Sequence, residues 1–576
     1  LYSIKPTTGD GDFTFSRDGS GASPATRVNS AGLIEKGREN YNLYSNTFTN
    51  AYYAKGNVSI TPNTAANPID GVVNASTITA SGIGTESRLR VSNAIAANQV
   101  QVISIYAKYT NHQYIYIRQI ATNKHATFDI QNGSVSYAPN DATQVEVRID
   151  SVGSGWYRLV YAFNASSMTN NLIDVGLSAS STIFSGSVAA GANAYIFAMQ
   201  LEAGLVATSY IETTTAAASA GILGDMPRLD YSGGATCPSL LLEPARTNLM
   251  VQSEGFSTST WMGNSFGVSA TENAAISPEG VQNATELEFT TTPAEIYDQF
   301  SNVASSMHVG TMFLKNNGVN VVQLELTGGA PNILAQVTVD LTDGTLSAQV
   351  GDYTPTIEDY GNGWWRVAIG DTANATVATP AFKIKSVGST GSFYVYGAQV
   401  EASSYPTSYV PTYGSATARA VDVCNKSSAT SVIGQTEGTM FIEAKIDADK
   451  TDDYNRIFGI SQGNDSYRII IFSDNQEKIS LNVKNAGVSQ AQIVSTISPF
   501  STFKAAVGYA ANDFVFYING QQIGTDSSGT VPACNTISLG THEDGSGTRG
   551  IEGSVKQALL FDTRLTNAEL AALTTL

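Results

Sequence analysis

An acidic run near residue 450 has the composition of a metal-binding loop. In the stretch "DADKTDDYN", Asp447, Asp449, Asp452 and Asp453 stand close together beside Asn455. Carboxylate and amide oxygens are the hard ligands that Ca²⁺ prefers. We therefore take these four aspartates as candidate metal ligands and Ca²⁺ as the only cofactor that the sequence suggests. The alternative is an acidic surface loop of a chain whose formal net charge is −18.

Two Gln-x-Glu pairs offer a second set of polar groups. Gln200 and Glu202 occur in "AYIFAMQLEAGLVATSYIET", and Gln399 and Glu401 occur in the similar "FYVYGAQVEASSYPTSYVPT". Hydrolysis of a glycosidic bond needs two carboxyl groups that flank that bond. No second acid recurs in a comparable context near each pair. The sequence therefore predicts no catalytic residues here and no enzyme.

Nucleophiles and general bases are equally sparse. Cys237, in "GGATCPS", is expected to be a small buried side chain rather than a nucleophile. His112 and His125 flank strands and are expected to lie in solvated loops. None of the four histidines adjoins a nucleophile motif such as GxSxG, and no phosphate-binding glycine loop is present in the sequence.

A repeated tryptophan motif indicates what the elements around these residues are. "DSVGSGWYRLVY" and "EDYGNGWWRVAI" place Trp156 and Trp364 after a glycine-bearing turn, and the flanking segments repeat in the same order with nearly constant spacing. Two copies of one domain would produce this pattern. A tryptophan needed in both copies is better explained as a packing residue at the end of a sandwich than as a sugar-stacking aromatic.

Each copy has the pattern of an antiparallel β domain. The segments "YIYIRQI" and "AYIFAMQL" alternate or run apolar as sandwich strands do. Asn132-Gly133 and Asp343-Gly344 predict tight type I′ hairpins between strands, because that turn requires positive φ at both central residues. We expect the same turn at Asn519-Gly520, and a short terminal helix that begins at Thr566 with Glu569 as its capping-box partner.

The predicted fold is all-β: three serial antiparallel β-sandwiches of jelly-roll or concanavalin-A-like type, the first two homologous, and a short C-terminal helix. Such a series predicts a stiff rod. The first copy lacks the lead-in that precedes the second, so we expect the start of the chain to pair with that lead-in. The predicted organisation is an N-terminal segment at 1–35 that pairs with 225–245, a first sandwich at 36–215, a lead-in and second sandwich at 216–423, a linker at 424–435 and a third sandwich at 436–576.

Composition and charge exclude several classes of function. Only 14% of the 576 residues are charged, the balance is strongly acidic, and no cluster of Lys and Arg interrupts it. Such a surface repels phosphate backbones, so no nucleic acid is expected as a partner. No stretch has the roughly 20 apolar residues of a membrane span, so no membrane insertion is expected. The three cysteines have no spacing for zinc or for a disulfide framework.

Two resemblances to known families add to this. The segments "FVFYINGQQIG" and "GSVKQALLFDTRLTNAELAAL" resemble a laminin-G/concanavalin-A-like domain. The stretches "GDFTFSRDGSGASPATRVNSAGLIE", "PRLDYSGGATCPSLLLEPARTNL" and "GNGWWR" resemble bacteriophage virion fibre and structural proteins whose repeated β-sandwiches are similar to carbohydrate-binding modules. Calcium sites are frequent in the lectin-like family.

What these resemblances imply is an exposed virion protein, a tail or head fibre on the virion surface. It would contact host-surface glycans through its lectin-like sandwiches. Its other expected partners are further copies of itself, with a homotrimer favoured, and other virion proteins. The alternative is a purely structural capsid or tail decoration protein without a ligand, and the third reading is a glycan depolymerase.

Overall fold

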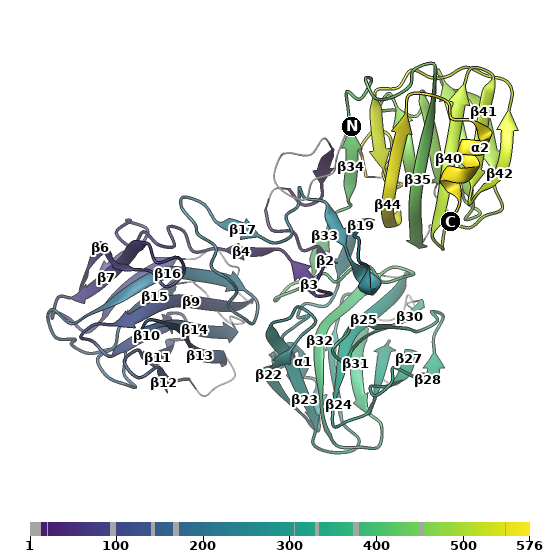
Figure 1. Ribbon diagram of the computed structural model, residues 1–576. Helices are drawn as coiled ribbons and strands as arrows, with labels where there is room; N and C mark the ends of the chain where they lie inside the picture. The colour runs from purple at the N-terminus through teal and green to yellow at the C-terminus, as the bar shows by residue number, and fades with distance from the viewer. Residues whose placement is uncertain are drawn as a thin grey trace.

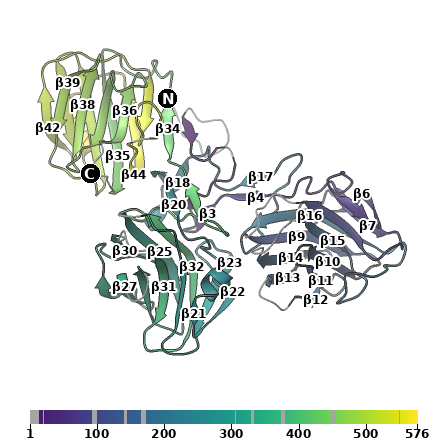
Figure 2. The same ribbon diagram turned by 180° about the vertical axis from the view of Figure 1, so that it is seen from behind.

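A computed structural model describes residues 13–19, 21–92, 99–139, 144–164, 172–303, 306–328, 333–372, 379–448, 454–547 and 549–576. Its three β-sandwiches meet at one junction instead of following one another in a row (Figures 1 and 2). The all-β prediction is confirmed, and the prediction of a rod is wrong. The reason is that the start of the chain and the lead-in run between the sandwiches and hold them together.

The first sandwich consists of two six-stranded antiparallel sheets that enclose a core of aliphatic and aromatic side chains. We name each sheet after one of its central strands. The β10 sheet has the order β12 (Ser134–Tyr137), β11 (Lys124–Asp129), β10 (Tyr114–Gln119), β15 (Leu172–Leu177), β8 (Ser87–Ser92) and β5 (Ala54–Gly56). The β9 sheet has the order β13 (Gln144–Gly153), β14 (Trp156–Asn164), β9 (Val100–Tyr109), β16 (Asn193–Ala203), β7 (Val73–Ala80) and β6 (Val58–Ala66).

The second sandwich repeats this topology strand for strand. Its β26 sheet has the order β28 (Leu346–Val350), β27 (Ile333–Asp340), β26 (Val321–Thr327), β31 (Ala381–Ser386), β24 (Glu295–Gln299) and β21 (Ser265–Phe266). Its β25 sheet has the order β29 (Thr356–Asp359), β30 (Trp364–Thr372), β25 (Met307–Asn317), β32 (Gly391–Ala402), β23 (Gln282–Phe289) and β22 (Val268–Ile276). A short helix, α1 (Ser259–Met262), packs beside β24.

Strand register shows that the two copies correspond residue by residue. Trp156 lies opposite Lys108, and Trp364 lies opposite Lys315. Shifting the pairing of a strand by one residue would turn its core-facing side chains to the outside. Equal register in the two copies therefore means that equivalent positions face the core in both. The predicted duplication is confirmed.

The third sandwich has two seven-stranded sheets. The β36 sheet has the order β1 (Thr14–Ser16), β34 (Val423–Lys426), β43 (Thr536–Leu539), β36 (Asn455–Ser461), β37 (Arg468–Ser473), β38 (Ile479–Asn485) and β39 (Val488–Val494). The β35 sheet has the order β18 (Arg228–Asp230), β19 (Ser239–Leu242), β44 (Glu552–Phe561), β35 (Glu437–Ala448), β40 (Phe503–Ala510), β41 (Asp513–Ile518) and β42 (Gln521–Asp526).

Two boundaries differ from the sequence prediction. The sequence prediction places the lead-in strands β18 and β19 with the second sandwich, but β19 pairs with β44 and so extends the third. The segment 424–435, predicted to be a linker, begins within strand β34. An exposed strand edge gains hydrogen bonds by pairing with any available segment, and that explains both recruitments. The terminal helix α2 (Asn567–Thr574) begins as predicted, with Thr566 and Glu569 forming the capping box.

Only one of the three predicted type I′ hairpins forms. Asn519 and Gly520 both have positive φ, 51° and 80°, between β41 and β42. At the other two turns only Gly133 and Gly344 have positive φ. There the loops are longer because the preceding aspartates accept backbone hydrogen bonds: Asp129 Oδ1 accepts from Asn132 N at 2.9 Å.

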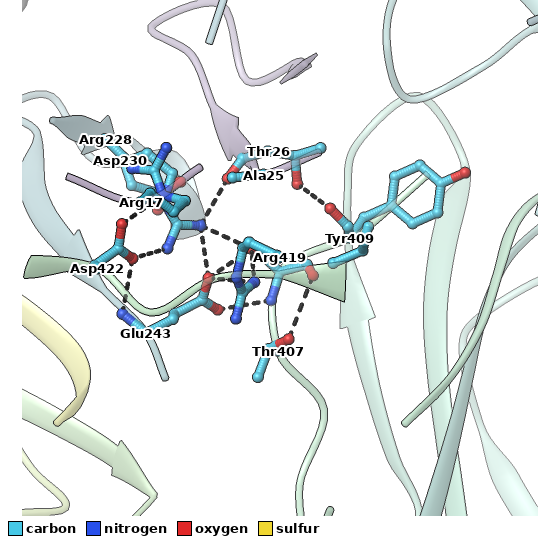
Figure 3. A network of polar contacts seen from close by, with 12 residues as sticks. Arg17, Ala25, Thr26, Arg228, Asp230, Glu243, Thr407, Tyr409, Arg419 and Asp422 are labelled. Atoms are coloured by element: carbon cyan, nitrogen blue, oxygen red, sulfur yellow. Dashed lines mark hydrogen bonds and ion pairs between the residues drawn. The ribbon is translucent and has the colours of Figure 1, made fainter. Parts of the chain in front are cut away.

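The junction of the sandwiches is a buried network of ions (Figure 3). Asp422 accepts from Arg17 at 2.6 Å and from Arg228, and Glu243 accepts from Arg228 at 2.6 Å and from Arg419 at 2.7 Å. All five side chains are at most 3% exposed. The network therefore ties the start of the chain and the lead-in to the segment that connects the second and third sandwiches.

The start of the chain also contacts the lead-in directly. Tyr231 N donates to Val28 O at 2.9 Å, and Arg228 Nη1 donates to Thr26 O at 3.0 Å. Three two-stranded ladders complete the junction: β2 (Thr26–Val28) with β3 (Ile34–Lys36), β4 (Arg38–Asn40) with β17 (Ala218–Ala220), and β20 (Arg246–Asn248) with β33 (Thr417–Arg419). A single 3₁₀ turn, Ser232–Gly234, follows β18.

Candidate functional site

The repeated Gln-x-Glu pairs hold the C-terminal tail of each copy. Glu401 accepts from Thr407 N at 2.9 Å and from Thr407 Oγ1 at 2.6 Å, and Gln399 Oε1 accepts from Val410 N at 2.6 Å. In the first copy Thr208 N donates to Glu202 at 3.0 Å, and Ile211 N donates to Gln200 at 2.7 Å. All four side chains are buried. Their hydrogen-bonding capacity is used within the protein, which leaves none for a substrate.

Trp156 and Trp364 lie beneath the same tails. Each is 2% exposed, but each belongs to a small cluster on the outer face of its sheet and not to the main core. Tyr409 of the tail packs in the Trp364 cluster, and Tyr210 packs in the Trp156 cluster. The predicted plug at the end of the sandwich is therefore wrong in position, because on β14 and β30 the tryptophan points away from the core.

Sequence reasoning missed a third repeated group. Asn40 and Asn248 occupy equivalent positions before each sandwich. Asn248 Nδ2 donates to Ala398 O at 3.1 Å and to Val410 O at 2.8 Å, and Asn40 Nδ2 donates to Ile211 O at 2.8 Å. The signal was available in "GRENYNL" and "PARTNLM", where an asparagine precedes the first residues of both copies.

The candidate calcium loop lies mostly outside the described residues. Asp449, Asp452 and Asp453 are not described, and Asp447 is exposed and forms an ion pair with Lys445. Calcium binding there stays a prediction. Two smaller predictions are wrong: Cys237 is exposed, and His125 lies within strand β11. Cys237 stands in a glycine-rich turn that has no core to enter, and His125 is held in the strand by stacking on Tyr137 at 4.5 Å between ring centroids.

The third sandwich brings charged and aromatic side chains together on the outer face of its β36 sheet. Glu543, 2% exposed, accepts from Arg456 Nε at 2.9 Å and from Arg468 at 3.2 Å. Asp465 contacts both arginines, and His542 Nε2 lies 3.3 Å from Asp465 and from Glu543. We call these five residues the rim cluster. None of the five is among the candidate site residues predicted from the sequence.

Aromatic side chains extend the rim cluster along the sheet. Tyr454 is 43% exposed, and its ring lies 5.8 Å from that of Phe472. Phe472 is the strand partner of Arg456. Asn482 accepts from Arg468 at 3.2 Å on the next strand. An exposed aromatic face beside amide, carboxylate and guanidinium groups provides both the stacking surface and the hydrogen-bonding groups that a saccharide requires.

Two carboxyls in and beside the rim cluster have lowered pKa values. Burial alone raises the pKa of Asp465, but Arg468 and Arg456 more than offset this and hold it below its usual range. The pKa of Asp544 is also lowered, against the effect of burial, by hydrogen bonds from Ser546. A general acid for glycoside hydrolysis needs a raised pKa. These two carboxyls are shifted in the opposite direction.

The rim cluster also contains three residues of types that can bind a metal ion. Asp465, His542 and Glu543 offer ligand atoms within 4.8 Å of one another. Two guanidinium groups already contact Asp465 Oδ1 and Glu543 Oε1, however, and their positive charges oppose a divalent ion. This donor set therefore fits a metal poorly.

Among the described residues no helix is long and apolar enough to cross a membrane.

Comparisons with known proteins bear on the third sandwich. Residues 426–571 match the family model described as "Concanavalin A-like lectin/glucanases superfamily". The third sandwich has the concanavalin-A-like fold that its sequence predicts. The family description covers binding proteins and enzymes alike. No curated protein matches the sequence.

Solved structures resemble parts of the chain at low scores. The CBM40 domain of a Ruminococcus gnavus IT-sialidase is 15% identical with a TM-score of 0.23, over 26% of this chain and 88% of that one. The tandem CBM22-1-CBM22-2 domains of Paenibacillus barcinonensis Xyn10C are 10% identical with a TM-score of 0.20, over 67% of this chain and 100% of that one. Likenesses at this level carry no argument about function.

Proposed function

We propose that the chain is an exposed, non-catalytic appendage protein of a bacteriophage virion, a tail or head fibre, that contacts glycans of the host surface. The observation that carries glycan binding is the rim cluster beside the exposed Tyr454, on a sandwich of the lectin/glucanase family. The virion part of the proposal has its support in the sequence resemblance of the first two sandwiches and the lead-in.

The absence of catalysis is part of the same proposal. Hydrolysis would need one carboxyl that stays protonated near neutral pH beside a second that is ionised. Arg456 and Arg468 favour ionisation of Asp465 at the rim. In the two repeats, the glutamates of the Gln-x-Glu pairs are engaged by backbone and threonine donors. An ionised Asp465 suits a binding site, and the engaged glutamates of the repeats suit a structural role.

Assembly into a homotrimer would suit this role. A single shallow saccharide site binds weakly, and linked copies raise the effective concentration of each site. Exposed edge strands such as β6 and β39 offer surfaces on which copies could associate, and pairing there would remove exposed edges. Sedimentation of the purified chain measures the oligomeric state directly.

A binding experiment tests the proposed function. The full chain is applied to an array of bacterial surface glycans, alongside Tyr454→Ala and the control Phe266→Ala, which removes a ring that is 62% exposed on the second sandwich. We expect Tyr454→Ala to weaken glycan binding by about tenfold, and Phe266→Ala to leave it unchanged. If the wild-type chain binds no glycan, the purely structural decoration protein becomes the better reading. Loss of polysaccharide viscosity on incubation would instead indicate a depolymerase.

A further inference from the structure

The outer face of the β10 sheet in the first sandwich gathers arginine side chains around one buried carboxylate. Asp174 accepts from Arg90 Nε at 2.7 Å and Nη2 at 2.9 Å, and from Arg118 Nη2. Glu86 pairs with Arg118 at 3.0 Å and with Arg88 at 3.0 Å. Three guanidinium groups thus face two carboxylates. These five groups together carry one excess positive charge in a chain whose net charge is −18, and the other carboxylate of this face, Asp129 opposite Tyr114, is held by Gln113 and Asn132.

Three polar atoms on this face are buried without any partner. They are the Tyr116 hydroxyl, Arg118 Nε and the Thr127 hydroxyl. Tyr116 and Thr127 are 0% exposed and stand opposite each other on β10 and β11, and Arg118 follows Tyr116 on the same face of β10. Buried polar atoms normally have a hydrogen-bond partner, because leaving one unpaired is costly. Each of these three atoms can donate a hydrogen bond.

The connection between β15 and β16, residues 178–192, covers this group. The Phe184 ring lies 4.2 Å from the Arg118 guanidinium carbon, 5.3 Å from the Tyr116 ring and 4.7 Å from the His125 ring. Thr182 O lies 3.2 Å from His125 Nε2. The three unpartnered donors are therefore shielded from bulk water by an aromatic side chain.

The second sandwich keeps only the threonine of this group, Thr338, and its hydroxyl accepts from Gln323 Nε2 at 3.4 Å. Register places Gln323 opposite Thr338 and Glu325 beside Lys383, where the first copy has Tyr116 opposite Thr127 and Arg118 beside Asp174. The second copy therefore has an acidic residue, Glu325, where the first has Arg118, and a basic residue, Lys383, where the first has Asp174. The covering connection is reduced to residues 387–390. The two copies share their fold although these residues differ, so the fold does not require them. The differences therefore concern what each face can bind.

We propose that the outer face of the β10 sheet binds the anionic group, a carboxylate or a sulfate, of an acidic saccharide. Arg118 Nε and the two hydroxyls donate to the oxygens of that group, and the excess positive charge selects it over a neutral sugar. Because the Phe184 ring lies 4.2 Å from the Arg118 guanidinium carbon, it has to turn aside before the ligand can reach these donors. The inference rests on the proposed glycan-binding function, because it assigns a class of glycan and places it on the first sandwich.

The test uses the full chain and two probes, trigalacturonate for the carboxylate and a sulfated disaccharide for the sulfate, with maltotriose as the neutral control. Binding is measured by calorimetry for the wild type, Tyr116→Phe and Thr127→Val. The matched controls are Gln323→Ala and Thr338→Val at the same positions of the second sandwich. We expect one charged probe to bind, maltotriose to bind at least tenfold more weakly, and each first-sandwich variant to lose about tenfold in affinity.

Thermal stability separates binding from a structural role. Because the two hydroxyls have no partner, Tyr116→Phe and Thr127→Val are expected to leave the melting temperature unchanged or to raise it. A fall in melting temperature would show that the hydroxyls bond within the protein, and it would overturn the proposal. So would unchanged affinity in both variants, or a wild type that binds neither charged probe. If array binding depends on Tyr454 but not on Tyr116, the proposed function stands and this inference fails.

Discussion

Arg228 and Asp422, 194 residues apart in the chain, form an ion pair that is at most 1% exposed. Arg228 comes from the lead-in and Asp422 from the segment that enters the third sandwich. Arg228 also pairs with Glu243, so one side chain joins the two carboxylates of the junction (Figure 3). The sandwiches are therefore connected by charges in a low-dielectric environment, where removing one partner is expensive.

Replacing Arg228 should destabilise the junction. Arg228→Met leaves Asp422 and Glu243 buried with one cation fewer, and breaking such a pair costs about 3–5 kcal/mol. The free energy of unfolding, measured by denaturant titration, checks this. The control is Arg27→Met, whose 2.8 Å pair with Glu35 is partly exposed and should contribute at most about 1 kcal/mol. Equal effects of the two changes would contradict the role given to burial.

The same network predicts loss of stability in acid. Burial opposes ionisation of Glu243, but Arg419 and Arg228 hold its pKa far below its usual range, and Arg228 and Arg17 lower the pKa of Asp422. A carboxyl with a lowered pKa in the folded state adds stability that is complete above its unfolded pKa, about 4, and is lost as the pH falls further. Melting temperatures from pH 7 to pH 2.5 should therefore drop steeply below about pH 4. Asp422→Asn should start lower at pH 7 and fall less, and parallel curves would refute the assignment.

The sequence predicted the sandwiches well because their signals are local and occur twice. Trp156 and Trp364 occur in matching strands with matching register, and the capping box at Thr566 and Glu569 lies within four consecutive residues. Alternating apolar residues and turn glycines report on neighbours in the chain. For this reason the fold class, the duplication and the terminal helix could be predicted.

What the sequence did not reveal depends on contacts between distant segments. Nothing around Leu240 indicates that it pairs with Val555, because an edge strand accepts any partner of suitable length. The rim cluster had the same difficulty: Arg456 and Arg468 stand in ordinary strand sequences, and their charges meet Glu543 only after folding. The partners of a buried ion pair are not spaced regularly along the chain, so a single sequence does not indicate which charges will pair.

Glu552 should behave in the opposite way to the junction carboxyls. Burial, assisted by Glu243 and Glu401, raises its pKa well above the usual range, against the effect of Arg246. Its Oε2 atom has no hydrogen-bond partner. A raised pKa in the folded state gives stability that is complete below the unfolded pKa, about 4.3, and is lost as the pH rises.

Glu552→Gln should therefore stabilise the protein at high pH. At pH 8 we expect a gain of at least about 1.4 kcal/mol, the value of one pKa unit, and at pH 4 no gain. Denaturant titrations at the two pH values measure the difference. The control Glu288→Gln, on an exposed strand position, should show no such pH dependence. A gain of the same size at both pH values would point to packing instead of charge.

Loss of the tail anchor should be local. In Glu401→Gln an amide replaces a carboxylate that accepts from Thr407 N, Thr407 Oγ1 and Gln399 Nε2, so at least one of these donors is left unpaired. The cost is about 1–3 kcal/mol. Hydrogen exchange at the amides of Thr407 and Val410 should become faster, while the equivalent amides Thr208 and Ile211 of the first copy keep their rates. The matched variant Glu202→Gln should show the reverse pattern. If either variant accelerates exchange throughout both copies, the glutamates stabilise the whole sandwich and do not serve merely as anchors of its tail.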